Sequence, residues 1–180
     1  IDRIRKIIDH VRVFSRDQQN EDQQVFDIAE TVNNSLLMVN RLFINNQIDL
    51  KVSLKNGPFL TFGNPNRLEQ VILNVLSNAR HAVEKRQHDA IPGYVKIILL
   101  ETSTDKNTHK IRIEDNGIGI PEHILGNVFD PFFTTKNAQE GTGLGLSISY
   151  GIIRDMKGSI EIESQQNHKT TVIIKLPAYQ

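Results

Sequence analysis

One long helical pattern constrains the fold of this chain more than any other feature. In the stretch NPNRLEQVILNVLSNARHAVEKR, residues 64–86, apolar side chains recur along one side of a helix, namely Leu68, Val71, Ile72, Val75, Leu76 and Ala79. An apolar stripe of this width has to be buried against a second layer of structure. Period-two alternation of apolar and polar residues supplies that layer, because it predicts strands within 48–54, 94–103, 109–115, 158–164 and 170–177.

Two more helices complete the pattern. We expect a short strand at Val25, a helix that Asp27 caps and that runs to about Asn45, and another amphipathic helix within 143–156. The resulting order is β-α-β-(β)-α-β-β, a long loop, and then α-β-β. This order predicts an α/β fold, a two-layer α/β sandwich in which three helices cover one face of a mixed sheet. The loop at about 121–140 is long for a compact domain and is typical of a functional lid or of a disordered segment.

Composition excludes several classes of function. The chain has 180 residues with 21 basic and 21 acidic side chains, so long-range attraction to nucleic acid is not expected. Without cysteine, neither disulfides nor thiolate chemistry is available. We also find no apolar run of the roughly 20 residues that span a bilayer, and no signal-peptide pattern. Because the first residue is Ile1, we expect a fragment of a longer protein.

The chain divides into three parts. Residues 1–16, IDRIRKIIDHVRVFSR, carry a single apolar stripe and predict a helix stub that needs a partner. Residues 17–22 are polar and aperiodic, which is typical of a linker. Residues 23–180 form the main domain.

A pair of asparagines lies within the long helix. Asn74 and Asn78 are four residues apart and therefore project from one face. Asparagine is a mediocre helix former, and its carbonyl oxygen suits Mg²⁺, which takes one or two protein oxygens together with substrate phosphates. The alternative is two exposed asparagines without a ligand.

Two stretches are rich in glycine. In EDNGIGIP, Asp115 ends a strand and Gly117 and Gly119 follow, so a carboxylate stands where the backbone can approach a flat ligand closely. An ordinary Asp-Asn-Gly turn is the alternative. In GTGLGLSIS, residues 141–149, alternating glycines lead into a helix whose N-terminal amides favour phosphate. Neither stretch has the spacing of a Walker loop or of a complete dinucleotide fingerprint.

Between the two stretches, FDPFFTTK places three phenylalanines in a segment that should otherwise be polar. They are Phe129, Phe132 and Phe133. They either anchor the loop to the core or act as the hinge and latch of a lid. Lys136 is within reach of a phosphate, or else is a solvated lysine.

In combination the four stretches resemble the ATP-binding catalytic domain of a bacterial sensor histidine kinase. That superfamily also contains DNA gyrase, the ninety-kilodalton heat-shock chaperone and MutL. The stretch NVLSNA matches the family's N box, DNGIG and GTGLGLS its two glycine boxes, and FDPFF its F box. The resemblance covers about 23–177, and the spacing from PFFTTK to GTGLGLSISYGI is most similar to the nitrogen-regulation and dicarboxylate-sensor branch.

The resemblance implies a Bergerat-type fold, ATP and Mg²⁺ as cofactors, and a set of site residues. Asn74 and Asn78 would hold the metal and, with Lys136, serve catalysis, and Asp115 would bond the exocyclic amine of adenine. The full implied ATP-binding set is Asn78, Asp115, Gly117, Gly119, Ile120, Phe133, Thr135, Lys136, Gly141, Thr142, Gly143, Leu144, Gly145, Leu146 and Thr170. The segment at about 121–140 would be the ATP lid.

The family also suggests what receives the phosphate. Hydrolysing members carry a glutamate where this chain has Asn74, and an amide cannot act as a base at neutral pH. We therefore expect transfer to a histidine on a dimerisation hairpin. None of the six histidines has the context of the family's phospho-acceptor motif, and the stub 1–16 resembles the end of the hairpin's second helix, so we expect the fragment to begin after the acceptor histidine.

The expected partners are the phospho-acceptor domain of the same protein, a response regulator, and a second copy in a full-length homodimer. The expected location is cytoplasmic, as in the inner part of a membrane-bound sensor. Three alternatives stay open: a degenerate regulatory nucleotide-binding module, an ATPase of the mismatch-repair, topoisomerase or chaperone type, and a serine kinase of the anti-sigma type.

Overall fold

The computed structural model describes residues 23–55, 57–88, 93–136 and 141–179. Its elements in chain order are β1 (Gln24–Asp27), α2 (Ile28–Asn45), β2 (Ile48–Ser53), β3 (Leu60–Gly63), α3 (Pro65–His88), β4 (Lys96–Asp105), β5 (Thr108–Asp115), α4 (Glu122–Leu125), α5 (Gly145–Asp155), β6 (Ser159–Gln165) and β7 (Lys169–Pro177). The expected helix stub 1–16 and linker 17–22 lie outside the described residues.

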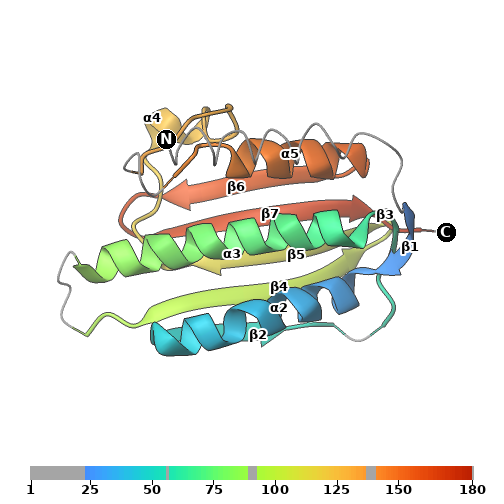
Figure 1. The fold of residues 1–180 in the computed structure, drawn as a ribbon, viewed down its shortest axis with the longest axis horizontal. Helices are drawn as coiled ribbons and strands as arrows, with labels where there is room; N and C mark the ends of the chain where they lie inside the picture. Colours follow the sequence, from blue (N-terminus) through green and yellow to red (C-terminus); the bar gives the residue numbers. More distant parts are fainter. Residues whose placement is uncertain (1–22, 56, 89–92, 137–140, 180) are drawn as a thin grey trace, which may run out of the picture.

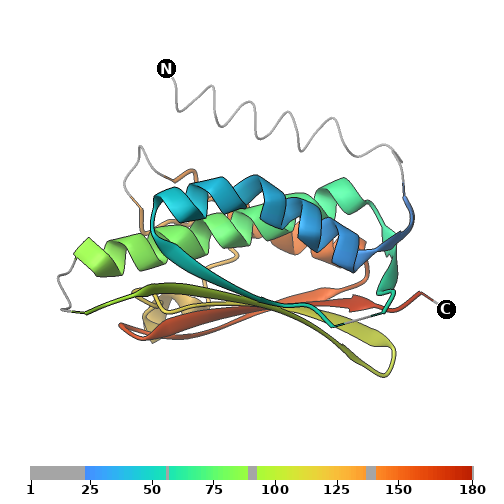
Figure 2. The same ribbon diagram turned by 90° about the horizontal axis from the view of Figure 1, so that it is seen from below.

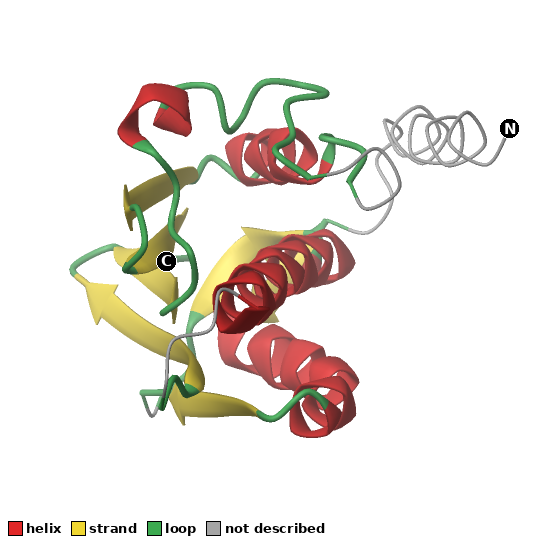
Figure 3. Ribbon diagram, turned by 90° about the vertical axis from the view of Figure 1, so that its left-hand side faces the viewer, coloured by secondary structure: helices red, strands yellow, loops and turns green. Residues whose placement is uncertain are grey.

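Two layers make up the domain. A five-stranded sheet in the order β2-β4-β5-β7-β6 forms one layer. Helices α2, α3 and α5 lie side by side on one face of it, with α3 in the middle (Figures 1 and 2). Seen from the end, α2, α3 and α5 stand on one side and the strands on the other (Figure 3). The two-layer sandwich that the sequence predicted is confirmed.

The sheet is mixed, as expected. Strands β4, β5, β7 and β6 pair antiparallel, whereas β2 pairs parallel with β4. Parallel neighbours require a crossover connection, and here the chain between β2 and β4 contains β3 and the whole of α3.

A second, two-stranded sheet was not expected. Strands β1 and β3 pair antiparallel, separately from the main sheet. The Oδ1 atom of Asp27 accepts hydrogen bonds from the amides of Ala29 (2.9 Å) and Phe59 (3.1 Å), so one carboxylate caps α2 and also holds the chain that leads into β3. The cap itself was predicted. Its second partner lies 32 residues away along the chain, which no local pattern reveals.

Helix α3 carries the centre of the core. Its predicted stripe is almost completely inaccessible to solvent, from Leu68 at 0% exposed to Ala79 at 4%. Burial of each large side chain of this kind contributes about 1.5–3 kcal/mol. Because this stripe fixes how the helix is rotated, it also determines which α3 side chains lie beside the strand ends and the loops.

The segment predicted as a lid is partly structured. It contains the short helix α4, which contacts β6 near the C-terminal end of that strand (Figure 1), and its described part ends at Lys136. Residues 137–140 lie outside the described part of the chain.

Candidate nucleotide-binding site

Asp115 is a buried carboxyl group at the end of β5. Its residue is only 5% exposed, and its Oδ1 accepts a hydrogen bond of 2.8 Å from the amide of Gly117. Burial raises the pKa of Asp115 to about 7, helped by the nearby charge of Glu114, while the Gly117 bond and the Arg86 charge act in the opposite direction. A carboxyl group that ionises near neutrality in a buried position is typical of a functional site.

Three further groups gather at this carboxyl. Asp115 is paired with Thr170 across the β5–β7 ladder, and Thr170 is buried as well. The Oγ1 atom of Thr170 lies 2.9 Å from Ser164 Oγ, which accepts a bond of 2.8 Å from the amide of Ile120. The structure therefore brings together Asp115, Ile120 and Thr170. It adds Ser164, which no motif singled out and which only the β6–β7 register makes a neighbour of Thr170.

The glycines of the first stretch are required by packing within the chain. A Cβ atom on Gly117 would lie 2.5 Å from the backbone carbon of Ala82. Gly119 has φ +64°, and a Cβ there would lie 2.1 Å from the carbonyl oxygen of Gln165. The amide of Ile118 also donates to the carbonyl of Ala82 (3.2 Å). The first glycine stretch is thus held directly against α3 and against the β6–β7 turn.

The two asparagines of α3 have different surroundings. The amide oxygen of Asn78 accepts a hydrogen bond of 3.0 Å from the ammonium group of Lys136. Asn74 instead donates a hydrogen bond of 2.9 Å to Ser149 Oγ. Its Oδ1 lies so close to Gly145 that a Cβ atom on that glycine would be 2.3 Å from it. Both residues share a face of α3, as predicted, but Asn78 faces the lid segment and Asn74 is packed against α5.

These different surroundings determine which of the two asparagines is better suited to bind Mg²⁺. Asn78 Oδ1 already attracts a cationic group, and a hard oxygen donor in that place suits Mg²⁺. Asn74 Oδ1 lies close to the backbone of Gly145 and its Nδ2 is bonded to Ser149, so Asn74 fits an indirect role better than direct ligation. Among the described residues no group of three or more His, Cys, Asp or Glu side chains could hold a metal ion.

His81 is a site residue that the sequence reasoning did not select. Its Nδ1 lies 2.6 Å from the carbonyl oxygen of Ser77, so Nδ1 carries the proton, and Nε2 accepts from Arg80 Nη2 at 3.4 Å. Burial lowers the pKa of His81, and the charges of Lys136 and Arg80 lower it further. The available signal was its position three residues after Asn78, which puts both side chains on one face of the helix.

The second glycine stretch lies against the lid segment. Gly143 has φ +70°, and a Cβ there would lie 2.4 Å from the backbone carbon of Phe132, while a Cβ on Gly141 would lie 2.8 Å from Thr134 Oγ1. Helix α5 then begins at Gly145, and its N-cap residue is Leu144, whose side chain cannot cap the first amides. Those amides remain suited to an anionic ligand.

The remaining predicted residues lie around this corner of the domain. Phe133 and Leu146 are half-buried, Thr135 is exposed, and Thr142 Oγ1 accepts a bond of 3.4 Å from the amide of Leu144. Of the three lid phenylalanines, Phe129 packs on the core and on the ring of Tyr150, with 5.4 Å between centroids. Phe132 is 60% exposed. The expectation that the aromatic rings anchor the loop therefore holds for Phe129 and not for Phe132.

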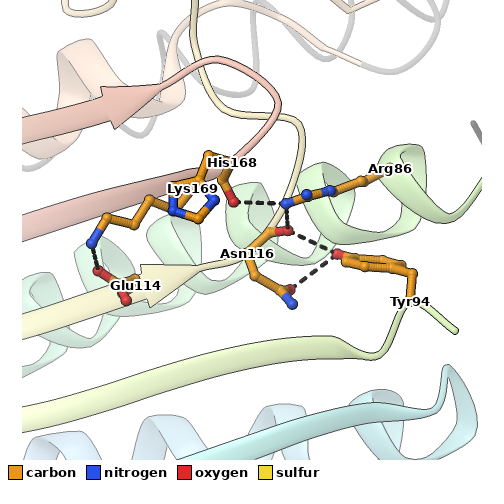
Figure 4. A pocket seen from close by; sticks show the side chains of 6 residues that line it. All are labelled: Arg86, Tyr94, Glu114, Asn116, His168 and Lys169. Atoms are coloured by element: carbon orange, nitrogen blue, oxygen red, sulfur yellow. Dashed lines mark hydrogen bonds and ion pairs between the residues drawn. The ribbon is translucent and has the colours of Figure 1, made fainter. Parts of the chain in front are cut away.

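A hollow of about 350 Å³ lies beside this site. It is lined by Arg86, Tyr94, Glu114, Asn116, His168 and Lys169 (Figure 4). Side chains of consecutive strand residues point to opposite faces, so the hollow that Glu114 and Asn116 line is on the other side of the strand from the Asp115 carboxyl group.

Comparison with known proteins gives consistent matches. Residues 63–180 match the family described as histidine kinase-, DNA gyrase B- and HSP90-like ATPase. The signal transduction histidine-protein kinase AtoS of Escherichia coli is 34% identical over 98% of this chain and 27% of its own length. The sensory histidine kinase/phosphatase NtrB of Rhizobium leguminosarum is 32% identical over 98% of this chain and 47% of its own length.

Solved structures agree with these sequence matches. The catalytic domain of the histidine kinase ThkA superposes with a TM-score of 0.74 at 26% identity, covering 88% of this chain and 99% of that domain. The mycobacterial sensor histidine kinase MprB gives a TM-score of 0.71 at 26% identity, covering 87% and 98%. The chain spans less than half the length of AtoS or NtrB. Within the described residues, every helix is too short or too polar to cross a membrane.

Proposed function

The chain belongs to the family of histidine kinase-, DNA gyrase B- and HSP90-like ATPases, and we propose that it is the ATP-binding kinase domain of a two-component sensor histidine kinase. In this proposal the domain transfers the γ-phosphate of ATP to a histidine on a dimerisation hairpin. Residues 23–180 form the catalytic domain, residues 1–16 end the hairpin's second helix, and the segment 121–140 is the ATP lid.

The observation that carries the proposal is a row of contacts along α3. Asn74, Asn78 and Ala82 follow one another at four-residue steps, which corresponds to about 6 Å of helix per step. Asn74 touches Gly145 of the second glycine stretch, Asn78 binds Lys136 of the lid, and Ala82 touches Gly117 of the first glycine stretch. A helix that contacts both glycine stretches and the lid in sequence supports one elongated ligand with a base at one end and phosphates at the other.

Each end of that row suits its part of ATP. At the Ala82 end, the ionised Asp115 carboxylate accepts a hydrogen bond from the exocyclic amine, and Thr170 lies beside it. At the Asn74 end, the first amides of α5 receive phosphate oxygens. Asn78 is the residue best placed for Mg²⁺, which when bound neutralises charge on the phosphates.

The residues at the phosphate end support transfer rather than hydrolysis. Asn74 donates to Ser149 and has no basic group to activate water. Catalysis then depends on positioning and on charge stabilisation by backbone amides, Lys136 and the metal. Relatives with names such as signal transduction histidine-protein kinase and two-component sensor support a histidine acceptor and a response regulator as partners. We further infer a homodimeric full-length protein with this domain in the cytoplasm.

Calorimetric titration with Mg-ATP tests the proposal. We expect the parent chain to bind and Asp115→Ala to lose most of its affinity. A second titration with Asp49→Ala, which changes an exposed carboxylate on β2, serves as the matched control and should leave affinity unchanged. If neither the parent nor the control binds ATP, the degenerate-module alternative takes first place.

A transfer assay separates the kinase from the ATPase alternatives. The domain is mixed with a separate dimerisation hairpin that carries the acceptor histidine, together with labelled ATP. We expect acid-labile, base-stable label on the hairpin and none on the domain alone. Steady release of inorganic phosphate without label on the hairpin would instead support a hydrolysing member of the superfamily.

A further inference from the structure

We propose that Arg86 is a positioning residue for adenine recognition, which holds the two strand ends that carry Asp115 and Thr170 in the arrangement that the base requires. The inference rests on the proposed function. Arg86 is in no motif and its guanidinium group lines the hollow shown in Figure 4, on the outer side of β5.

The contacts of Arg86 are concentrated on one atom. Its Nη1 lies within hydrogen-bonding distance of three backbone carbonyl oxygens, those of Asn116 (2.6 Å), Gly117 (3.2 Å) and His168 (2.7 Å). Hydrogen bonds from a charged donor are stronger than those between neutral groups. One cation therefore ties α3 to the loop after β5 and to the turn before β7.

These are the segments that place the adenine-binding groups. Asn116 and Gly117 directly follow Asp115, and His168 precedes Thr170 by two residues. The carboxyl of Asp115 is fixed by the amide of Gly117, so movement of this loop would move the acceptor itself. The Arg86 charge also lowers the pKa of Asp115 against the effect of burial, which favours the ionised acceptor.

Two neighbours hold Arg86 and the loop in place. The guanidinium carbon of Arg86 lies 5.2 Å from the ring centroid of Tyr94, a cation–π geometry. The Tyr94 hydroxyl lies 3.0 Å from Asn116 Oδ1 and 3.1 Å from the Asn116 carbonyl oxygen (Figure 4). Burial raises the pKa of Tyr94 to about 12, so the hydroxyl remains a donor at physiological pH.

The Asn116 side chain then locks the loop onto β4. Its Oδ1 accepts from the amide of Ile97 (2.9 Å) and its Nδ2 donates to the carbonyl of Val95 (2.8 Å). Arg86, Tyr94 and Asn116 form what we call the outer clamp. Arg86 is the next residue in the four-residue series of Asn74, Asn78 and Ala82 along α3. The same helix therefore contacts the proposed phosphate-binding, metal-binding and base-binding parts of the site in turn. Its Arg86 then holds the base-binding part from the outer side.

A clamp that merely stabilises the fold and a clamp that positions the adenine acceptor predict different binding. Inosine triphosphate carries a carbonyl oxygen where ATP carries the exocyclic amine, so it cannot donate that hydrogen bond to an ionised Asp115. Loss of positioning should weaken ATP and spare inosine triphosphate. Loss of overall stability should weaken both by the same factor.

The experiment measures the affinity ratio of the two nucleotides. Each is titrated with Mg²⁺ against bound trinitrophenyl-ATP, because displacement of a fluorescent analogue also measures weak competitors. The proteins are the parent, Arg86→Ala, Arg86→Lys, and Lys85→Ala, which removes an exposed cation from the same turn of α3. Asp115→Ala gives the ratio for complete loss of the acceptor.

We expect Arg86→Ala to lower the ATP affinity about fivefold to tenfold, the effect of one misaligned hydrogen bond, with inosine triphosphate affinity changed less than about twofold. Arg86→Lys keeps the charge but not the planar group, so its ratio should lie between the parent and Arg86→Ala. Lys85→Ala should equal the parent. If Arg86→Ala does not fold, the ratio for Arg86→Lys decides the question.

An unchanged ratio, or equal losses for both nucleotides, would overturn the inference and leave the outer clamp as a structural feature. That result is distinct from failure of the proposed function, in which the parent itself does not bind ATP.

Discussion

Replacement of Asp115 by asparagine should stabilise the ligand-free domain, and increasingly so as pH rises. The variant keeps an oxygen that can accept the Gly117 amide bond, but it has no charge to bury. Burial raises the pKa of Asp115 from 3.8 to about 7, so the folded parent resists ionisation that the unfolded chain undergoes freely.

The sign and size follow from proton linkage. Between pH 3.8 and about 7 the unfolded chain binds fewer protons than the folded domain, so the parent loses stability as pH rises and the loss is complete above pH 7. At about 1.4 kcal/mol per pH unit, the advantage of Asp115→Asn is about 2 kcal/mol at pH 5.5 and approaches about 4 kcal/mol at pH 8.5.

Urea unfolding of parent and variant at both pH values measures this difference. Glu114→Gln is the control of opposite sign. Burial raises the pKa of Glu114, but hydrogen bonds from Lys169 and Thr171 and the charge of Arg112 outweigh it and hold the pKa below its ordinary value. This control should therefore destabilise the domain at neutral pH. A constant difference between parent and Asp115→Asn, or a variant less stable than the parent at pH 8.5, would refute the reasoning.

Three further outcomes are expected. ATP affinity should fall as pH drops below about 7, by up to about tenfold per pH unit, because a protonated Asp115 carboxyl is a poorer acceptor for the hydrogen bond from the exocyclic amine. Calorimetry in buffers of different ionisation enthalpy should therefore detect proton release when ATP binds. Gly119→Ala should lower the free energy of unfolding by at least about 2 kcal/mol in urea titrations, because its Cβ would meet the Gln165 carbonyl at φ +64°. Asn78→Ala should remove the dependence of ATP affinity on Mg²⁺. Asn74→Ala should mainly lower the melting temperature, because Asn74 is packed against α5. Equal effects of the two changes on the Mg²⁺ dependence would contradict this assignment.

Some of the site could be anticipated from local sequence and some could not. The motif around Asp115, the paired asparagines and the glycine-rich helix start were all visible because each is a short run on one element. Thr170 came only from the family resemblance, and the β5–β7 register puts it beside Asp115. Ser164 was missed because it becomes a neighbour of Thr170 only when β6 pairs with β7. His81 was missed although its position three residues after Asn78 was a local signal.

The sequence by itself determined the elements and their buried faces. Helical spacing defined the buried stripe of α3, Asp27 marked the start of α2, and alternation marked the strands of the two C-terminal hairpins, because these signals depend on residues within a few positions of one another. The tertiary structure decided the rest. It placed β2 parallel to β4, separated β1 and β3 into their own sheet, set Lys136 on Asn78 across 58 residues, and brought Arg86 to the carbonyl of His168 across 82 residues. An arginine on a helix surface has the same local pattern whether it faces water or clamps two strand ends, so only the packing of α3 against the sheet gives Arg86 its partners.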